Sequence, residues 1–414
     1  MKKRSSPVPS IVGCLVIQLC VGIIYLWSAF NGKVVASFAW TKTAATMVSS
    51  YMLFAFVIGN FIGGFINDRK SPKFAAIIGV IMFAAGVGAS GLLTPGSIGL
   101  IYLTYSVIAG LGSGIAYGAC IQCLQKWLPH RRGLASGLAV SAFGFSTVVF
   151  GPVSEALMNA FQTDGLVNFG AVFPILAGVF FVLGIAACTF VRLPNAAYLA
   201  QLPKVSANTR VVSTKKNYTL SEAVKTVPFW VMFLYLIFIN ATWTLCFPVI
   251  RNLADPSEGG RLATAAAATF AVSFTGIPNA AGRLIMATVS DKFGRIPASL
   301  FLCALTAVAA ILMTFIAGIP FIIVVGLIAF GYGGPSAINA AITTDFFGPK
   351  NAGTNYGVIM MGLGVSSVLF NWISGAFLKS APTPTFIMAA VTAALAAGCM
   401  LVINVHLKKM KAEG

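Results

Sequence analysis

The chain has 414 residues, of which 58% are hydrophobic and only 9% are charged, and its mean hydropathy is +0.91. A soluble domain carries roughly 25% charged residues, so this composition excludes a soluble globular fold and indicates a polytopic membrane protein. The formal net charge of +18 does not indicate nucleic-acid binding, because the basic residues gather on one side of the predicted spans.

Stretches of about 20 apolar residues, taken from the N-terminus, predict twelve membrane-spanning helices, because this length crosses the bilayer core. They are residues 9–30, 43–67, 74–93, 98–125, 133–160, 168–193, 227–251, 263–289, 297–316, 320–345, 354–379 and 384–407. Strand-like alternation is absent, so we expect an all-α membrane protein. The longest polar stretch predicts an N-terminal six-helix half (1–193), a cytoplasmic linker (194–226) and a C-terminal six-helix half (227–414).

Most of the lysine and arginine residues fall in loops and chain ends on the same side of these spans as the N-terminus. Cytoplasmic loops carry such an excess. We therefore expect a multi-pass protein of the cell membrane (plasma membrane or bacterial inner membrane) with both termini in the cytoplasm. The positive net charge is then explained by the topology and by attraction to anionic lipid.

The sequence gives no indication of a metal centre, a cofactor or an enzyme. All eight cysteines fall within spans, and the pair Cys120 and Cys123 has neither a second pair nor a nearby histidine. We interpret them as small packing residues. The spans contain no catalytic set of acids or nucleophile–base pair and no filter-like pore motif, so we expect neither an enzyme nor a channel.

Two pairs of matching segments at nearly equal offsets indicate an internal duplication. Residues 129–137 and 349–357 share the spacing P-x-x-x-G-x-x-x-G, and Asp68-Arg69 after the second span corresponds to Asp291-Lys292 after the eighth. Two homologous six-helix halves explain both coincidences.

The first of these loops, GFINDRKSPK at 64–73, resembles the signature G-x-x-x-D-R-x-G-R-[RK] of the major facilitator superfamily, and ATVSDKFGR at 287–295 is similar. The resemblance implies the major facilitator fold, with twelve transmembrane helices in two pseudo-symmetric six-helix halves. It also implies a conformational latch formed by Asp68, Arg69, Asp291, Lys292 and Arg295. The alternative is that these charges only flank spans as topology determinants.

Further motifs resemble the oxalate/formate antiporter and monocarboxylate transporter branch of that superfamily. They are Tyr25 and Trp27, Tyr117-Gly118, residues 126–137, Asn279 to Arg283, Tyr332-Gly333-Gly334, residues 345–348 and Asn355-Tyr356-Gly357. The resemblance implies that Arg283 is the ligand of a substrate carboxylate.

The chain also departs from that branch. The second cation of the antiporter, a lysine, would align near Leu363, where no charge is present, and the family's Phe-Pro is replaced by Asn339-Ala340. Asn279 stands where animal monocarboxylate transporters have an aspartate, and the first span has no lysine before Lys33.

Arg283 is the only charged residue well inside a predicted span. Its guanidinium stays protonated, and a central arginine costs ~2.5–3.5 kcal/mol on insertion scales. No acidic residue lies in the membrane interior, because Glu155 and Asp345 stand near span ends, so we expect an external anion to neutralise it. One arginine fork matches one carboxylate, which favours a short monocarboxylate such as lactate, pyruvate or formate over oxalate. Alternatively, the side chain snorkels part of the way to the cytoplasmic surface or bonds carbonyls at a helix break near Pro278.

Other polar and aromatic residues inside spans complete the expected substrate site. Asn279 lies four residues before Arg283 on the same helix face, and Tyr117, Tyr332 and Tyr25 offer phenolic donors and an apolar wall. Weaker candidates are Asn240, Trp243, Asn339, Tyr356 and Asn371. For each single aromatic residue, packing is the alternative interpretation.

We therefore expect a monomeric secondary transporter of short organic anions that works by alternating access between two halves, with protons as the coupling ion. Anion exchange of the oxalate/formate type stays open because no Asp, Glu or His lies in the interior to carry a proton. A carboxylate sensor built on a transporter fold also stays open.

Overall fold

The computed structural model describes residues 6–22, 26–202, 214, 216–254, 262, 264, 267, 270–271, 274–377 and 382–412. The chain forms two compact units. Unit 1 comprises Met1–Pro129, Leu138–Val205 and Lys350–Gly357, and unit 2 comprises His130–Gly137, Ser206–Pro349 and Val358–Gly414. Each unit thus includes the start of one helix whose remainder belongs to the other unit. The predicted division at the linker 194–226 stays a prediction.

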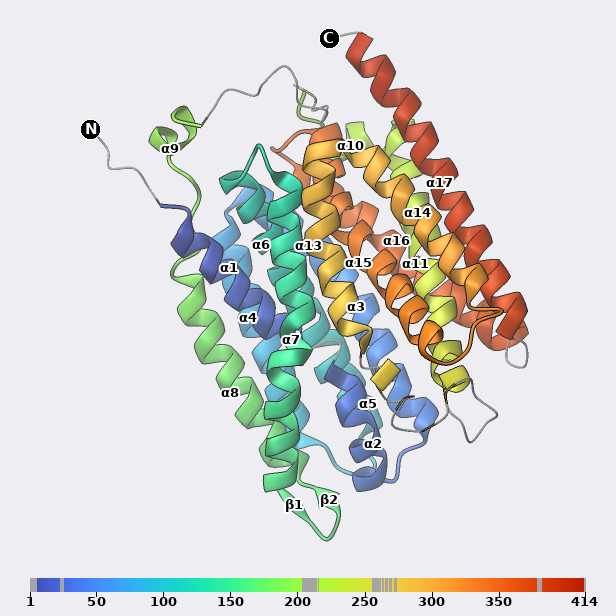
Figure 1. Cartoon of the computed structure of the whole chain (residues 1–414). Coiled ribbons are helices and arrows are strands. Elements are labelled where there is room, and N and C mark those ends of the chain that lie inside the picture. The colour runs from blue at the N-terminus through green and yellow to red at the C-terminus, as the bar shows by residue number, and fades with distance from the viewer. Residues whose placement is uncertain are drawn as a thin grey trace. The chain divides into compact units, whose positions relative to one another are not determined.

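The elements of the N-terminal part are nearly all helical (Figure 1). In chain order they are α1 (Val8–Val21), α2 (Trp27–Phe38), α3 (Lys42–Arg69), α4 (Pro72–Ala89), the 3-10 turn η2 (Ser90–Leu92), α5 (Ile98–Ile101), the π-helical η3 (Tyr102–Ala109), α6 (Gly110–Trp127), α7 (Arg132–Ala160), β1 (Gln162–Thr163), β2 (Leu166–Val167), α8 (Phe169–Cys188) and α9 (Ala196–Ala200). The hairpin pairs Gln162 with Val167. Its turn residues Asp164 and Gly165 both have positive φ, as a two-residue hairpin loop requires.

The first predicted span differs from the observed helices. The sequence predicts one span over 9–30, whereas the structure describes α1 up to Val21 and then α2 from Trp27 to Phe38. The helix ends at Val21 and is followed by Gly22, where an added Cβ would meet the carbonyl oxygen of Phe143 in α7. Tyr25 lies outside the described residues.

Every described secondary-structure element of the C-terminal part is a helix. The helices are α10 (Leu220–Ala223), α11 (Val227–Ala254), α13 (Gly276–Phe293), α14 (Arg295–Leu312), α15 (Ile319–Phe347), α16 (Ala352–Phe377) and α17 (Pro382–Ala412). The end of the linker lies along α15, because the amides of Thr214 and Tyr218 donate to the carbonyls of Asp345 and Phe347 at 2.9 Å each. The linker is therefore packed against unit 2 at these points rather than wholly solvated.

Ten helical stretches within the described residues are long and apolar enough to cross a membrane. The shorter apolar α1 and the helix α13, which carries Arg283, Asp291 and Lys292, account for the other two predicted spans. The all-α fold with twelve expected spans is thereby confirmed.

Candidate functional site

Arg283 lies in the middle of α13 and is buried, with 4% of its surface exposed. Its side chain lies against α15 in unit 2. A Cβ added at Gly333 of α15 would stand 3.2 Å from the Cγ of Arg283 and would also meet the carbonyl oxygen of Asn279. Only glycine allows the two helices to approach so closely, because any side chain at position 333 would push them apart. The stem of the arginine is thus held by backbone packing.

The backbone carbonyl of Asn279 and the side-chain stem of Arg283 both lie against Gly333 of α15. Asn279 is half-buried and Arg283 is buried, and their four-residue spacing places both on one helix face. This pair provides several N–H donors, a positive charge and one amide acceptor. Such a donor set can bind a carboxylate and an adjacent hydroxyl or keto oxygen.

Tyr332 precedes Gly333 on α15 and therefore lies beside the contact with α13. Its ring stacks on Trp243 of α11, with ring centroids 4.8 Å apart and an interplanar angle of 14°. Both residues are half-buried. Unit 2 thus brings Arg283, Asn279 and Tyr332 to adjoining parts of α13 and α15, and Trp243, a weaker candidate, orients the tyrosine ring.

The remaining candidates are more scattered. Tyr117 is 2% exposed in unit 1, where its ring packs between Phe56 and Phe143 at 5.0 and 5.1 Å. These contacts account for its burial by packing, and a binding role for Tyr117 stays a prediction. Tyr356 is buried in unit 1, and Asn371 is exposed on α16.

Two further asparagines lie in unit 2. Asn240 donates from its side chain to the carbonyl of Leu236 at 2.7 Å. Asn339 is fully buried, and neither its side-chain nitrogen nor its oxygen has a hydrogen-bond partner among the described residues. A buried amide without partners costs free energy. A water or ligand that bonds the side-chain amide of Asn339 would remove this cost.

A buried charge cluster lies at the end of α13 in unit 2. Asp345 accepts from the guanidinium of Arg132 at 2.7 Å and from the Nε of Arg295 at 3.0 Å. Arg295 also donates to Asp291 at 2.5 Å and to the hydroxyl of Ser290 at 2.7 Å. Two carboxylates therefore balance two guanidinium groups. This balance is needed because an uncompensated buried charge is strongly destabilising.

Asp291 also binds the first turn of α7. Its two carboxylate oxygens accept from the amides of Gly133 and Leu134 at 2.9 and 2.7 Å. The first amides of a helix have no intrahelical partner, and the helix dipole favours an anion there. A Cβ at Gly133 would stand 2.9 Å from an Asp291 oxygen, which explains why this position of the repeated glycine motif is glycine.

Unit 1 contains the corresponding arrangement with a different partner. Asp68 accepts from the amide and from the hydroxyl of Thr354 at 2.8 Å each, in the first turn of α16. A Cβ at Gly353 would stand 2.9 Å from the Cα of Gly64 and 3.0 Å from an Asp68 oxygen. Both copies of the glycine motif thus let an aspartate reach a helix start, but among the described residues only the cluster of unit 2 adds arginines.

The latch residues predicted from the sequence are therefore only partly brought together. Asp291 and Arg295 meet, and Asp68 reaches a helix start. Arg69 and Lys292 are exposed and lie over the rings of Phe65 and Phe293 at 4.0 and 5.4 Å, so their role in a latch stays a prediction. Arg132, Asp345 and Thr354 are not among the predicted latch residues, although the motifs 126–137, 345–348 and 349–357 contain them.

Comparisons with known proteins extend over nearly the whole chain. A family model described as Major Facilitator Superfamily matches residues 12–272 and 260–413. The oxalate:formate antiporter of Oxalobacter formigenes is 26% identical over 396 residues, which are 93% of this chain and 88% of that protein. Apicoplast pyruvate carrier 1 of Toxoplasma gondii is 23% identical over 464 residues, covering 90% of this chain and 84% of that protein.

A solved structure shares the fold. The crystal structure of FucP, a major facilitator superfamily transporter of E. coli in the outward conformation, has a TM-score of 0.66 and 15% sequence identity. The match covers 95% of this chain and 98% of that chain.

Proposed function

Because this chain belongs to the major facilitator superfamily, we propose that it carries a short monocarboxylate across the membrane by alternating access. The observation that carries the proposal is the position of Arg283, a permanent cation with 4% of its surface exposed in the middle of α13. Burying a charge of this kind is costly, and a substrate carboxylate bound to it offsets part of that cost.

Arg283 binds the carboxylate in this proposal through two parallel N–H···O hydrogen bonds. Such charge-assisted bidentate pairs are about twice as strong as neutral hydrogen bonds and fix the plane of the carboxylate. Asn279, on the same helix face, binds the hydroxyl or keto oxygen next to that carboxylate. Tyr332 forms one wall, held by its stack on Trp243. Tyr117 and Tyr25 remain sequence-based candidates for substrate contacts.

The number of cations in the proposed substrate site favours one carboxylate rather than two. A dicarboxylate needs a second positive charge, since an unpaired buried carboxylate costs several kcal/mol. Position 363 of α16, where the resemblance implies that cation, is a leucine. Lactate, pyruvate and formate therefore fit the proposed site better than oxalate.

The proposed coupling is symport with a proton, so that the carboxylate and the proton cross together. Exchange of one anion for another is the second candidate, and the likeness to an oxalate:formate antiporter over 93% of the chain favours it. Uptake into proteoliposomes distinguishes the two. Symport predicts accumulation of substrate driven by an inward proton gradient. Uptake that does not depend on the gradient and is stimulated by internal substrate indicates exchange.

The distribution of basic residues also supports a location in the cell membrane with both termini in the cytoplasm. In this orientation the loops that contain Asp68 and Asp291 face the cytoplasm. Labelling of single cysteines introduced at Lys70 and Lys292 by a membrane-impermeant thiol reagent tests it. Labelling of intact cells from outside would contradict the orientation.

The substrate role of Arg283 is tested by binding of lactate, pyruvate, formate and oxalate to the purified protein and to the variant Arg283→Lys. Lysine keeps the charge but loses the fork, and a charge-assisted hydrogen bond contributes about 1.5–3 kcal/mol, so we expect affinity for the preferred monocarboxylate to fall about 10- to 100-fold. Arg192→Lys is the matched control, because that arginine side chain is exposed and should leave affinity unchanged.

Unchanged affinity in Arg283→Lys would refute the ligand role. Binding without net flux in proteoliposomes would instead identify a sensor. Tighter binding of oxalate than of any monocarboxylate would show that the charge argument selects the wrong substrate.

A further inference from the structure

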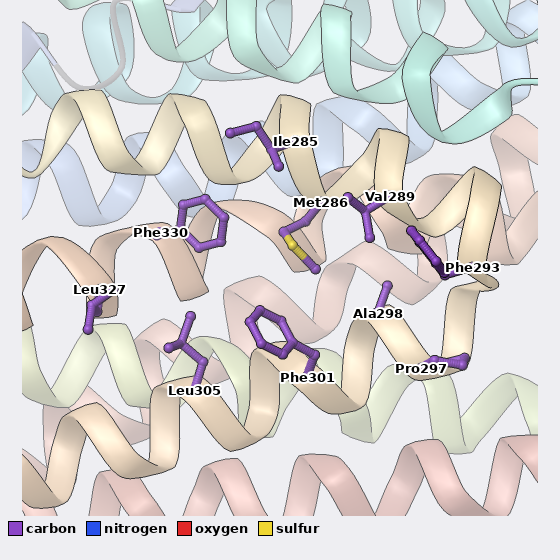
Figure 2. Close-up of a pocket in the computed structure, with 10 residues that line it drawn as sticks. All are labelled: Ile285, Met286, Val289, Phe293, Pro297, Ala298, Phe301, Leu305, Leu327 and Phe330. Carbon is purple, nitrogen blue, oxygen red and sulfur yellow. The ribbon is translucent and has the colours of Figure 1, made fainter.

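An apolar groove lies between α13, α14 and α15 of unit 2. Its volume is about 550 Å³, and all its lining side chains are hydrophobic. Figure 2 shows Met286, Phe301 and Phe330 converging on it from the three helices. The groove runs along α13 toward Phe293 at one end. A long apolar chain fits this shape better than a compact polar solute does.

The rim of the groove is exposed. Ile285, Phe293 and Phe301 keep 49%, 48% and 54% of their surface accessible, whereas Arg283 and Ala287 on another face of α13 are buried. In a multi-pass membrane protein, large apolar side chains exposed along a spanning helix face lipid chains, because water would be expelled from such a surface. The groove is therefore accessible from the hydrocarbon of the bilayer.

A positive charge stands at the Phe293 end. Lys292 is exposed, its Nζ lies 5.4 Å above the centre of the Phe293 ring, and it takes part in none of the ion pairs found among the described residues. The neighbouring Arg295 is engaged by Asp291 and Asp345. Lys292 is thus the cation that an anion at this end of the groove would meet.

We propose that the groove binds one acyl chain of an anionic phospholipid whose phosphate is held by Lys292. Basic positions beside spanning helices attract anionic lipid headgroups, and the lysine and the apolar surface are adjacent through Phe293. The headgroup then lies beside the loop that carries Asp291 and Arg295. This lipid site is independent of which substrate the protein carries.

The test is native mass spectrometry of the purified full-length protein, delipidated in detergent and titrated with dioleoyl phosphatidylglycerol or dioleoyl phosphatidylcholine. We expect one phosphatidylglycerol to be retained more strongly than phosphatidylcholine. Lys292→Gln should weaken it about fivefold, which corresponds to the ~1 kcal/mol contributed by one basic residue near an anionic surface. Ile285→Trp should weaken both lipids, because the larger ring fills the rim of the groove.

Two matched controls separate a site from general attraction. Lys70 lies over the Phe74 ring at 5.0 Å in the corresponding loop of unit 1, so Lys70→Gln removes the same charge away from the groove. Ile277 is 63% exposed on α13 but does not line the groove, so Ile277→Trp adds the same bulk elsewhere. Both should retain the lipid, and thermal unfolding checks that all four variants are folded.

Equal retention of the two lipids by the wild type would overturn the proposal. An equal loss of phosphatidylglycerol retention in Lys292→Gln and Lys70→Gln would also overturn it, since the lipid would then respond to surface charge in general. If the wild type is a dimer that Ile285→Trp separates, the groove is an interface between two copies rather than a lipid site.

Discussion

Replacing Asp345 with asparagine is expected to destabilise unit 2 strongly. Asp345 is 4% exposed and accepts from Arg132 and Arg295 at 2.7 and 3.0 Å. Asparagine has nearly the same shape but no charge. The cluster would change from two carboxylates and two guanidinium groups to one carboxylate and two guanidinium groups, which leaves one excess positive charge in a buried place.

The magnitude follows from the burial of the partners. Removing one member of a buried ion pair costs ~3–5 kcal/mol, and the 13% exposure of Arg132 allows some solvent relief. We therefore expect a loss of about 3 kcal/mol in the free energy of unfolding. Adding Arg132→Gln restores the charge balance, with Arg295 still paired to Asp291. The double variant should recover ~1–2 kcal/mol, within the usual range of couplings between contacting residues.

The assay is the half-life of folded protein in detergent at a fixed high temperature, because proteins of this size commonly unfold irreversibly. Asp345→Asn should shorten the half-life about tenfold or more, and the double variant should lengthen it again. Glu155→Gln, an exposed carboxylate on α7, is the control and should have little effect. If Asp345→Asn behaves like Glu155→Gln, or the double variant is worse than the sum of its parts, the charge-balance reasoning is wrong.

Two other predictions concern the helix starts. Gly353→Ala should cost ~1–3 kcal/mol by overpacking, because its Cβ would lie 2.9 Å from the Cα of Gly64; the half-life in detergent measures this. The pKa of Glu222 is lowered to about 2, chiefly by hydrogen bonds from the amide and hydroxyl of Thr219. Its contribution to the start of α10 is therefore complete above the ordinary pKa of 4.5 and should be lost as the pH falls from 4.5 to about 2, as measured by hydrogen exchange.

Each of these predictions has a simple control. Gly398 on α17 has open space around the position of its Cβ, so Gly398→Ala should be neutral or stabilising, as in an ordinary helix interior. A similar loss in both glycine variants would contradict the packing argument. Glu222→Gln should remove the pH dependence of exchange at α10 between pH 4.5 and about 2. If protection from hydrogen exchange at α10 falls equally with pH in Glu222→Gln and in the wild type, another titratable group is responsible for the pH dependence.

The fold could be predicted from the sequence because its signals are local. Apolar length gives the spans, and the repeated glycine spacing gives the duplication. The shared face of Asn279 and Arg283 also follows from helix periodicity alone. The end of α1 at Val21 could not be predicted from apolar length, and the close approach of Gly22 to Phe143 joins residues distant in sequence.

The partners of the predicted charges were harder to foresee for the same reason. Arg132 and Asp345 each stand near a span end. A charge at such a position can equally be interpreted as a topology determinant without a buried partner. Their pairing joins residues more than half the chain apart. The stacking of Tyr332 on Trp243 likewise depends on how α11 and α15 pack. Thr354 carries no charge and gave no signal at all beyond its place in the glycine motif.

The two aspartates that meet helix starts differ in how temperature acts on them. Asp68 is bound by the amide and hydroxyl of Thr354, whereas Asp291 belongs to a cluster with Arg295, Arg132 and Asp345. The hydration free energy of ions becomes less favourable on warming, so the cost of burying an ion network falls as temperature rises. We therefore expect warming to stabilise the start of α7 relative to that of α16.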